Sequence, residues 1–380
     1  MQKISLNRDT LEKVNLNEND CVNCKKCFNI CPMMKEYGDS PKSILQSIYN
    51  EKSIDKNIPF SCMLCNACVT NCPKDIDLKS MFYDIRTEIT KQNPKELKDL
   101  GYNKIKFHQK SSFSPVFSKG FIDKGSQKIF FPGCSLSSYS RELVMKTYEY
   151  LKEHIEDISI VFGCCGKPTL DIGDSSKFEK YYSEVDKLFK NNEISEVIVA
   201  CPNCFNTIKR NSPGLVVTPI WSVINKYGVT KSLENHYKDL NIQFSLHDPC
   251  PVREEVEIHK DVRSILNSLG VNIAEFDNNR GNTDCCGSGG MVRVTNSEIS
   301  VRQTNKRASE AKTDNIVTYC ESCCESMLSC GKSTLHVLDF IFNDDVINKK
   351  KFTQREVSFM GKWANRYKLK REMEGKNDTK

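Results

Sequence analysis

The cysteines of this chain occur in four ordered sets whose spacing is typical of iron ligands. Twenty cysteines are present. Two four-cysteine sets have the spacing C-x2-C-x2-C-x3-C-P and comprise Cys21, Cys24, Cys27 and Cys31, then Cys62, Cys65, Cys68 and Cys72. Two five-cysteine sets combine a single cysteine, a later Cys-Cys-Gly and a final C-x2-C, and comprise Cys134, Cys164, Cys165, Cys201 and Cys204, then Cys250, Cys285, Cys286, Cys320 and Cys323. Such regularly spaced thiols predict bound iron and sulfide, and therefore electron transfer.

The two four-cysteine sets predict two [4Fe-4S] cubanes, each of which needs one thiolate per iron. In the bacterial pattern the fourth cysteine, which precedes a proline, ligates the other cluster. We therefore expect one cubane on Cys21, Cys24, Cys27 and Cys72, and the other on Cys62, Cys65, Cys68 and Cys31. Zinc is the alternative, but zinc sites favour two separate C-x2-C pairs without the trailing proline seen here.

The five-cysteine sets predict a different kind of metal centre, because five thiolates exceed the four irons of a cubane. Adjacent side chains also diverge in an extended backbone, so a Cys-Cys pair fits an ordinary cubane poorly. An unusual, open cluster follows, and Gly166 and Gly287 would let the backbone pass close to it. We take as candidate catalytic residues the two vicinal pairs and a nearby histidine: Cys164, Cys165, Cys285, Cys286 and His247. His247 could donate a proton or simply stabilise its loop.

The elements that would position these cysteines are helices in the N-terminal region and an internal repeat of strands and helices after it. Apolar residues at helical spacing follow Pro41 and again follow Cys72. In the repeat, the predicted strands are 128–131, 158–162, 196–200, 242–246, 271–276 and 316–319, and the predicted helices are 141–154, 177–191, 259–269 and 297–312. Strands alternating with helices predict small α/β domains with parallel sheets. Each final C-x2-C should then begin a helix, whose free N–H groups favour an anionic cluster.

These patterns divide the chain into five parts. We expect a helical two-cubane domain at 1–95, a polar linker at 96–127, α/β domains at 128–236 and 237–345, and a basic tail at 346–380. The tail carries Met360, Trp363 and Tyr367, which could form one apolar stripe on a helix. Cys324 and Cys330 belong to no set, and either packing or a spare redox role would suit them.

Charge and hydropathy limit the classes of partner. The formal charge of +6 is largely offset by bound clusters, at about −2 for each cubane, so it is poor support for nucleic-acid binding. No apolar run reaches the length of a membrane-spanning helix, and the first residues lack the apolar core of a secretory signal. We therefore expect a cytoplasmic protein, in which metal binding suits the cysteines better than disulfides do. Contact of the basic tail with the inner face of the membrane is an alternative.

The complete set of motifs resembles the CCG-domain (cysteine-rich domain) iron–sulfur family. In domain order, an α-helical ferredoxin module before two Cys-Cys-Gly domains, the chain is similar to the D-type subunits of heterodisulfide reductases. That resemblance implies two cubanes, two noncubane [4Fe-4S] clusters on the five-cysteine sets, a small disulfide substrate and a separate donor or acceptor subunit. The motifs equally resemble the iron–sulfur subunits of glycolate oxidase and anaerobic glycerol-3-phosphate dehydrogenase. The alternative is therefore electron transfer from a flavin-linked dehydrogenase (glycolate, lactate or glycerol-3-phosphate type) to a membrane acceptor.

Overall fold

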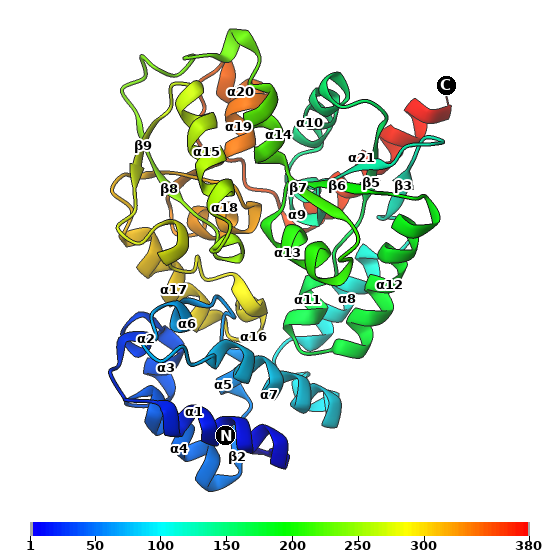
Figure 1. The fold of residues 1–380 in the computed structure, drawn as a ribbon. Coiled ribbons are helices and arrows are strands. Elements are labelled where there is room, and N and C mark those ends of the chain that lie inside the picture. Colours follow the sequence, from blue (N-terminus) through cyan, green and yellow to red (C-terminus); the bar gives the residue numbers. More distant parts are fainter. Residues whose placement is uncertain (1–2, 379–380) are drawn as a thin grey trace. The chain divides into compact units, whose positions relative to one another are not determined.

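Chain segments that are far apart in sequence combine to form each of two structural units. A computed structural model describes residues 3–378. The first unit comprises Met1–Phe107, Pro168–Phe178 and Gly281–Ser309, and the second comprises His108–Lys167, Glu179–Arg280 and Glu310–Lys380. Figure 1 shows their elements coloured along the chain. The first unit therefore contains the expected cubane domain together with two later stretches of the chain.

The first unit is built from short helices around a small apolar core. Its N-terminal part contains β1 (Lys3–Ser5), α1 (Arg8–Asp20), α2 (Lys26–Ile30), α3 (Pro32–Tyr37), α4 (Pro41–Glu51), β2 (Ser53–Asp55), α5 (Asn57–Phe60), α6 (Ala67–Thr70), α7 (Leu78–Gln92) and η1 (Pro94–Leu97). The later stretches contribute α11 (Lys167–Asp171), η5 (Gly289–Met291), α16 (Val292–Thr295) and α17 (Ser297–Ser309). β1 and β2 pair antiparallel. Phe60, Phe82 and Ile85 are almost fully buried at the centre, where α7 packs on α1 and α5.

Arg86 on α7 holds the later stretches in the first unit. Its side chain is fully buried, with 0% exposed. Nε donates a hydrogen bond to the carbonyl oxygen of Pro59 at 2.7 Å, and Nη1 donates to Asp171 at 2.6 Å and Gly290 at 2.7 Å. Nη2 donates to the carbonyl oxygen of Cys62. Burial lowers the pKa of Arg86, and these charge-assisted bonds offset the cost of burying the cation.

The second unit contains two sheets. In the larger sheet the strands are β3 (Lys119–Phe121), β5 (Ile158–Phe162), β4 (Lys128–Phe131), β6 (Glu196–Val199) and β7 (Val216–Pro219), in that order. Only β3 is antiparallel to its neighbour. The smaller sheet is fully parallel and has the order β11 (Ser333–His336), β10 (Asn315–Thr318), β8 (Gln243–His247) and β9 (Asn272–Glu275). Every residue of β5 is buried, as expected for a strand covered on both faces.

Helices connect the strands and cover the sheets. They are α8 (Tyr102–Ser112), α9 (Cys134–Tyr139), α10 (Arg141–His154), α12 (Ser175–Asn191), α13 (Pro202–Asn211), α14 (Ile220–Tyr227), α15 (Val256–Ser268), α18 (Glu321–Leu328), α19 (Val337–Phe342), α20 (Asp344–Ile347) and α21 (Phe359–Asp378). Short turns of 3-10 helix lie at η2 (Lys231–Leu233), η3 (Cys250–Val252) and η4 (Arg280–Asn282). α14 packs on α15, and α10 packs on α19.

The fold class predicted from the sequence is confirmed: a helical N-terminal region precedes two α/β repeats with small sheets of mainly parallel strands. The stretch expected to be a linker, 96–127, contains α8 and β3 and is therefore structured. The prediction of an apolar stripe of Met360, Trp363 and Tyr367 in the tail is wrong. Met360 is 73% exposed and Tyr367 is 46% exposed, whereas α21 buries Arg366, Leu369 and Met373.

Candidate metal centres

The two C-x2-C-x2-C loops of the first unit share an unusual backbone conformation. In both loops the residues before and after the middle cysteine have positive φ angles. These residues are Asn23 (53°), Lys25 (59°), Leu64 (50°) and Asn66 (67°). A left-handed conformation costs roughly 1–2 kcal/mol at a residue with a side chain, so something in the folded state must stabilise it. The tight bends bring the three thiols of each loop to one side.

The first pocket of this unit collects cysteines from both four-cysteine sets. It is lined by Cys21, Cys24, Cys27 and Cys72. Burial raises the pKa of the Cys27 thiol to about 11, and the nearby thiols of Cys21, Cys72 and Cys24 add to the rise. The pocket therefore contains the four thiols that the sequence assigns to the first cubane, including the one from the more distant set.

The second pocket contains the complementary four thiols. Cys31, Cys62, Cys65 and Cys68 line it. Burial raises the pKa of Cys31 to about 12, with Cys62 the next largest cause. Cys68 also lines the first pocket, so the two pockets adjoin. Each pocket thus gathers four thiols, and the raised pKa values of Cys27 and Cys31 mean that these two ionise only when a cation compensates the charge. Both donor sets therefore fit an iron–sulfur group.

All five thiols of the first five-cysteine set lie together in the second unit. Cys134 begins α9, Cys164 and Cys165 follow β5, and Cys201 and Cys204 begin α13. Hydrogen bonds link Cys134 to Cys164, Cys165 to both Cys164 and Cys204, and Cys201 to Cys204. Bonds from Cys164 and Cys204 lower the pKa of the Cys165 thiol, and the bond from Cys204 lowers the pKa of the Cys201 thiol. This all-sulfur donor set fits an iron–sulfur group.

Gly133 makes the close approach of these thiols possible. Its φ angle is +80°, and a Cβ there would lie 3.1 Å from Sγ of Cys204 and 3.2 Å from Cβ of Cys201. A larger residue at position 133 would therefore push Cys134 away from Cys201 and Cys204. The sequence reasoning emphasised the glycines after the Cys-Cys pairs and missed this one, although it directly precedes Cys134.

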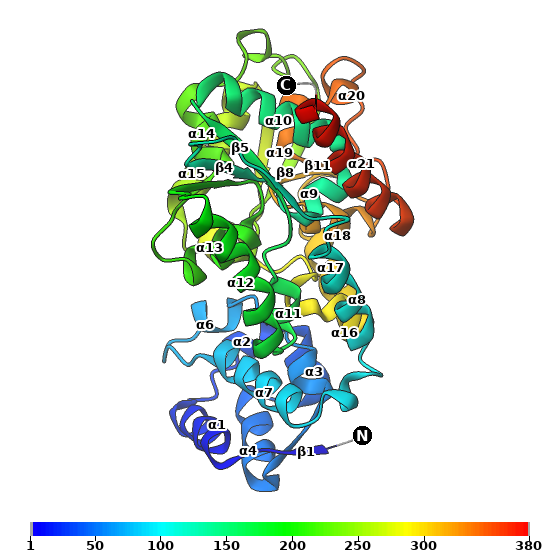
Figure 2. The same ribbon diagram turned by 90° about the vertical axis from the view of Figure 1, so that its right-hand side faces the viewer.

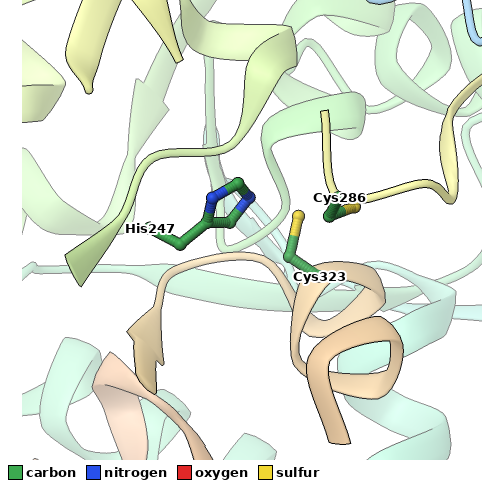
Figure 3. Close-up of side chains that lie close together, drawn as sticks. All are labelled: His247, Cys286 and Cys323. Carbon is green, nitrogen blue, oxygen red and sulfur yellow. The ribbon is translucent and has the colours of Figure 1, made fainter. Parts of the chain in front are cut away.

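The second five-cysteine set contributes three thiols and a histidine to the second unit. His247 ends β8, Cys250 begins η3, and Cys320 and Cys323 lie at the start of α18. His247 is fully buried, and its ring nitrogen lies within 4.8 Å of Sγ of Cys323 (Figure 3). Asp248, the next residue, is held by Arg263 at 2.8 Å and by the Tyr319 hydroxyl at 2.8 Å. This buried pairing fixes the end of β8 and hence the position of the histidine.

The Cys285–Cys286 pair of the same set belongs to the first unit. Ser300 donates a hydrogen bond to the carbonyl oxygen of Gly287, and Gln303 donates to that of Cys285 at 2.9 Å. Cys285 lines the second pocket together with Cys62 and the other thiols of the expected second cubane. A thiol from a Cys-Cys-Gly motif therefore lies beside a cubane-type site.

Glycines after the pair allow this close approach. A Cβ on Gly290, whose φ angle is +57°, would lie 2.5 Å from the carbonyl oxygen of Cys62, and one on Gly289 would overlap the carbonyl oxygen of Met63. Gly289 and Gly290 thus make a backbone-to-backbone contact with the loop that follows Cys62. Arg86 also donates hydrogen bonds to the carbonyl oxygens of Cys62 and Gly290. No sequence pattern identifies it as a residue that positions this site.

Comparison with known proteins gives the class of protein. The model of a 4Fe-4S dicluster domain matches residues 20–77, and that of the cysteine-rich CCG domain matches 129–209 and 244–328. The chain belongs to the iron–sulfur proteins that carry CCG domains beside a ferredoxin-type dicluster domain. It is 24% identical over 390 residues to the D-type subunit of the heterodisulfide reductase of Methanosarcina barkeri, covering 87% of this chain and 93% of that one.

A second relative is the B-type subunit of the CoM/CoB fumarate reductase of Methanothermobacter marburgensis. It is 23% identical over 329 residues, covering 80% of this chain but only 66% of the relative's length. Among solved structures, a hypothetical protein from Helicobacter pylori shares the fold, with a TM-score of 0.54 and 12% identity over 92% of this chain and 76% of that one. Within residues 3–378, none of the helices has the length and apolar character needed to cross a lipid bilayer.

Proposed function

We propose that this chain is the iron–sulfur component of a disulfide-reducing oxidoreductase. Electrons would enter at the two pockets of the first unit and leave through the five-cysteine sets. The observation that carries this proposal is the position of Cys285, which lines the same pocket as Cys31, Cys62, Cys65 and Cys68. The likeness to the D-type subunit of heterodisulfide reductase supports a disulfide as the substrate.

The proposed ligands follow the pockets and the thiol contacts. Cys21, Cys24, Cys27 and Cys72 would hold one cubane, and Cys31, Cys62, Cys65 and Cys68 the other. Each five-cysteine set would hold a noncubane [4Fe-4S] cluster. Cys68 lines both pockets, which supports a short distance for electron transfer between the two cubanes proposed for the first unit.

The reaction consumes two electrons and two protons and converts one disulfide into two thiols. When bound, the clusters supply electrons one at a time and offer iron as a partner for sulfur. The chain supplies the rest. Its buried thiols hold the metal, and His247, beside Cys323, would deliver a proton to a departing thiolate. Asp248, fixed by Arg263 and Tyr319, keeps the histidine in position.

Anaerobic purification followed by iron analysis and turnover tests this proposal. The wild type should contain about 16 irons if all four sites hold four-iron clusters, and reduced viologen should be oxidised by a small-molecule disulfide. C285S should keep the visible spectrum of the cubanes but lose disulfide turnover. C330A, at a cysteine outside all four sets, is the matched control and should behave as the wild type.

Two results would contradict the proposal. About eight irons with empty five-cysteine sets would remove the disulfide chemistry. A full complement of iron, no turnover with any disulfide of a panel, and rapid cluster reduction by a flavoprotein would instead favour the flavin-linked alternative. The flavin-binding part would lie outside residues 1–380, because these residues contain no Gly-rich dinucleotide-binding fingerprint.

A further inference from the structure

The C-terminal helix α21 is attached to the element that carries the first thiol of the first five-cysteine set. α21 packs along α9 and α10, as Figure 2 shows. The Asn365 side chain donates hydrogen bonds to the carbonyl oxygens of Ser138 at 2.8 Å and Tyr139 at 3.0 Å, at the end of α9. Cys134 is the first residue of α9. A helix outside both matched CCG segments therefore supports this metal centre.

Arg366 is the polar residue that α21 buries at this contact. Only 4% of it is exposed. Nη1 donates to Oγ of Ser112 at 2.9 Å, and the guanidinium lies 4.7 Å from the ring centroid of Trp363 and 5.6 Å from that of Phe117. Nη2 is buried and has no hydrogen-bond partner within residues 3–378. A cation buried with an unused donor is strongly unfavourable unless an anion compensates it.

The groups around Arg366 point to the thiol set as the source of that anion. Ser112, which accepts the hydrogen bond from Arg366, lies on α8 one turn after Gln109. Gln109 on α8 lies 3.5 Å from Sγ of Cys164. Its neighbour His108 packs on Trp363. Burial lowers the pKa of His108 to about 4, so this histidine is neutral at pH 7 and adds no charge.

We propose that Arg366 is a positioning residue of the first five-cysteine centre. Its unused Nη2 donates to the anionic iron–sulfur group held by Cys134 and its four partners, and its charge raises the reduction potential of that group. The inference rests on the proposed function, which assigns a cluster to these thiols. Hydrogen bonds and net charge are established determinants of cluster potential. The basic tail is thereby an internal part of an electron-transfer site.

Redox titration of the anaerobically purified full chain, followed by electron paramagnetic resonance, tests the role of Arg366. In R366M, the reduced-to-oxidised ratio of one cluster at fixed potential should fall roughly tenfold, which is a shift of 59 mV for a one-electron couple. R366K retains the charge and should shift the ratio less than threefold. K368Q removes an exposed charge from the same helix and should leave all midpoints unchanged.

A second variant guards against simple unfolding. S112D places a carboxylate beside Nη1 of Arg366 and neutralises it without altering α21, so it should reproduce the shift seen in R366M. Unchanged midpoints in R366M or S112D, with iron content at the wild-type value, would overturn the inference. Wild-type protein without iron at this set would instead contradict the proposed function, so the two failures are distinguishable.

Discussion

Replacing Arg86 by methionine should open the first unit. The variant loses four hydrogen bonds from a cation and leaves four buried carbonyl oxygens, those of Pro59, Cys62, Asp171 and Gly290, without their donor. Hydrogen bonds to charged groups contribute about 1.5–3 kcal/mol each, but they share one side chain and do not add. A buried carbonyl left without its donor costs about 1–3 kcal/mol. We expect a loss of about 4 kcal/mol in the opening free energy of this unit.

Hydrogen exchange measured by mass spectrometry is the suitable assay, because it reports on segments rather than on the whole chain. Peptides covering residues 57–66 and 285–295 should exchange about a thousandfold faster in R86M, since each 1.4 kcal/mol is a factor of ten. R86K keeps the charge but reaches fewer carbonyls, so its effect should be intermediate.

R8M is the matched control for this change. Arg8 forms an ion pair with Glu12 on the surface of α1, and its side chain is 90% exposed. Such pairs contribute little to stability, so exchange in the two peptides should stay at the wild-type rate. The reasoning fails if R86M exchanges as slowly as R8M while both proteins retain their iron.

Three further substitutions have clear expectations. G287A should lower iron content and destabilise the fold by about 2–4 kcal/mol. The φ angle of Gly287 is +93°, and a Cβ there would overlap Oγ1 of Thr304. G125A is the control for the φ angle alone, because Gly125 has a φ of +86° and open space around it. H336N should flatten the acid side of the stability profile. Burial lowers the pKa of His336 to about 3, so between pH 6.5 and 3 the unfolded state binds more protons. His336 therefore lowers the free energy of unfolding of the wild type by about 2 kcal/mol between pH 6.5 and pH 5. Urea titration at each pH should show a corresponding shift of the unfolding midpoint in the wild type but not in H336N. C324A should leave iron content unchanged, because Cys324 lies outside the four motif sets and lines neither pocket of the first unit. A loss of iron in C324A would make it a ligand.

The parts of the structure that were predictable from the sequence depend on local patterns. The strand Ile158–Phe162 consists of apolar and small residues, and its bounds were predicted correctly because both of its faces are buried. Cys201 and Cys320 each precede a helix, as expected for a C-x2-C that follows a strand. The short strands β7 and β11 were missed, since four residues beside a helix leave little periodicity.

What was not predictable depends on partners that are distant in sequence. Arg86 and Gly290 are 204 residues apart, and no spacing rule connects an arginine in an amphipathic helix to a glycine so remote. Arg366 looks like one more cation in a basic tail. Its burial follows from the docking of α21 on α9, which the predicted stripe of Met360, Trp363 and Tyr367 did not anticipate.

The composition of the first unit also has a consequence for the timing of biosynthesis. Cys62 and its loop emerge early from the ribosome, but Gly290, which contacts this loop, is synthesised about 230 residues later. At roughly 5–20 residues per second, the loop waits about 10–45 s for its partner. During that interval its thiols are exposed to the solvent, to oxidants and to competing metals. Loading of the second pocket with iron in its final environment is therefore a late event, which follows synthesis of residues 281–309.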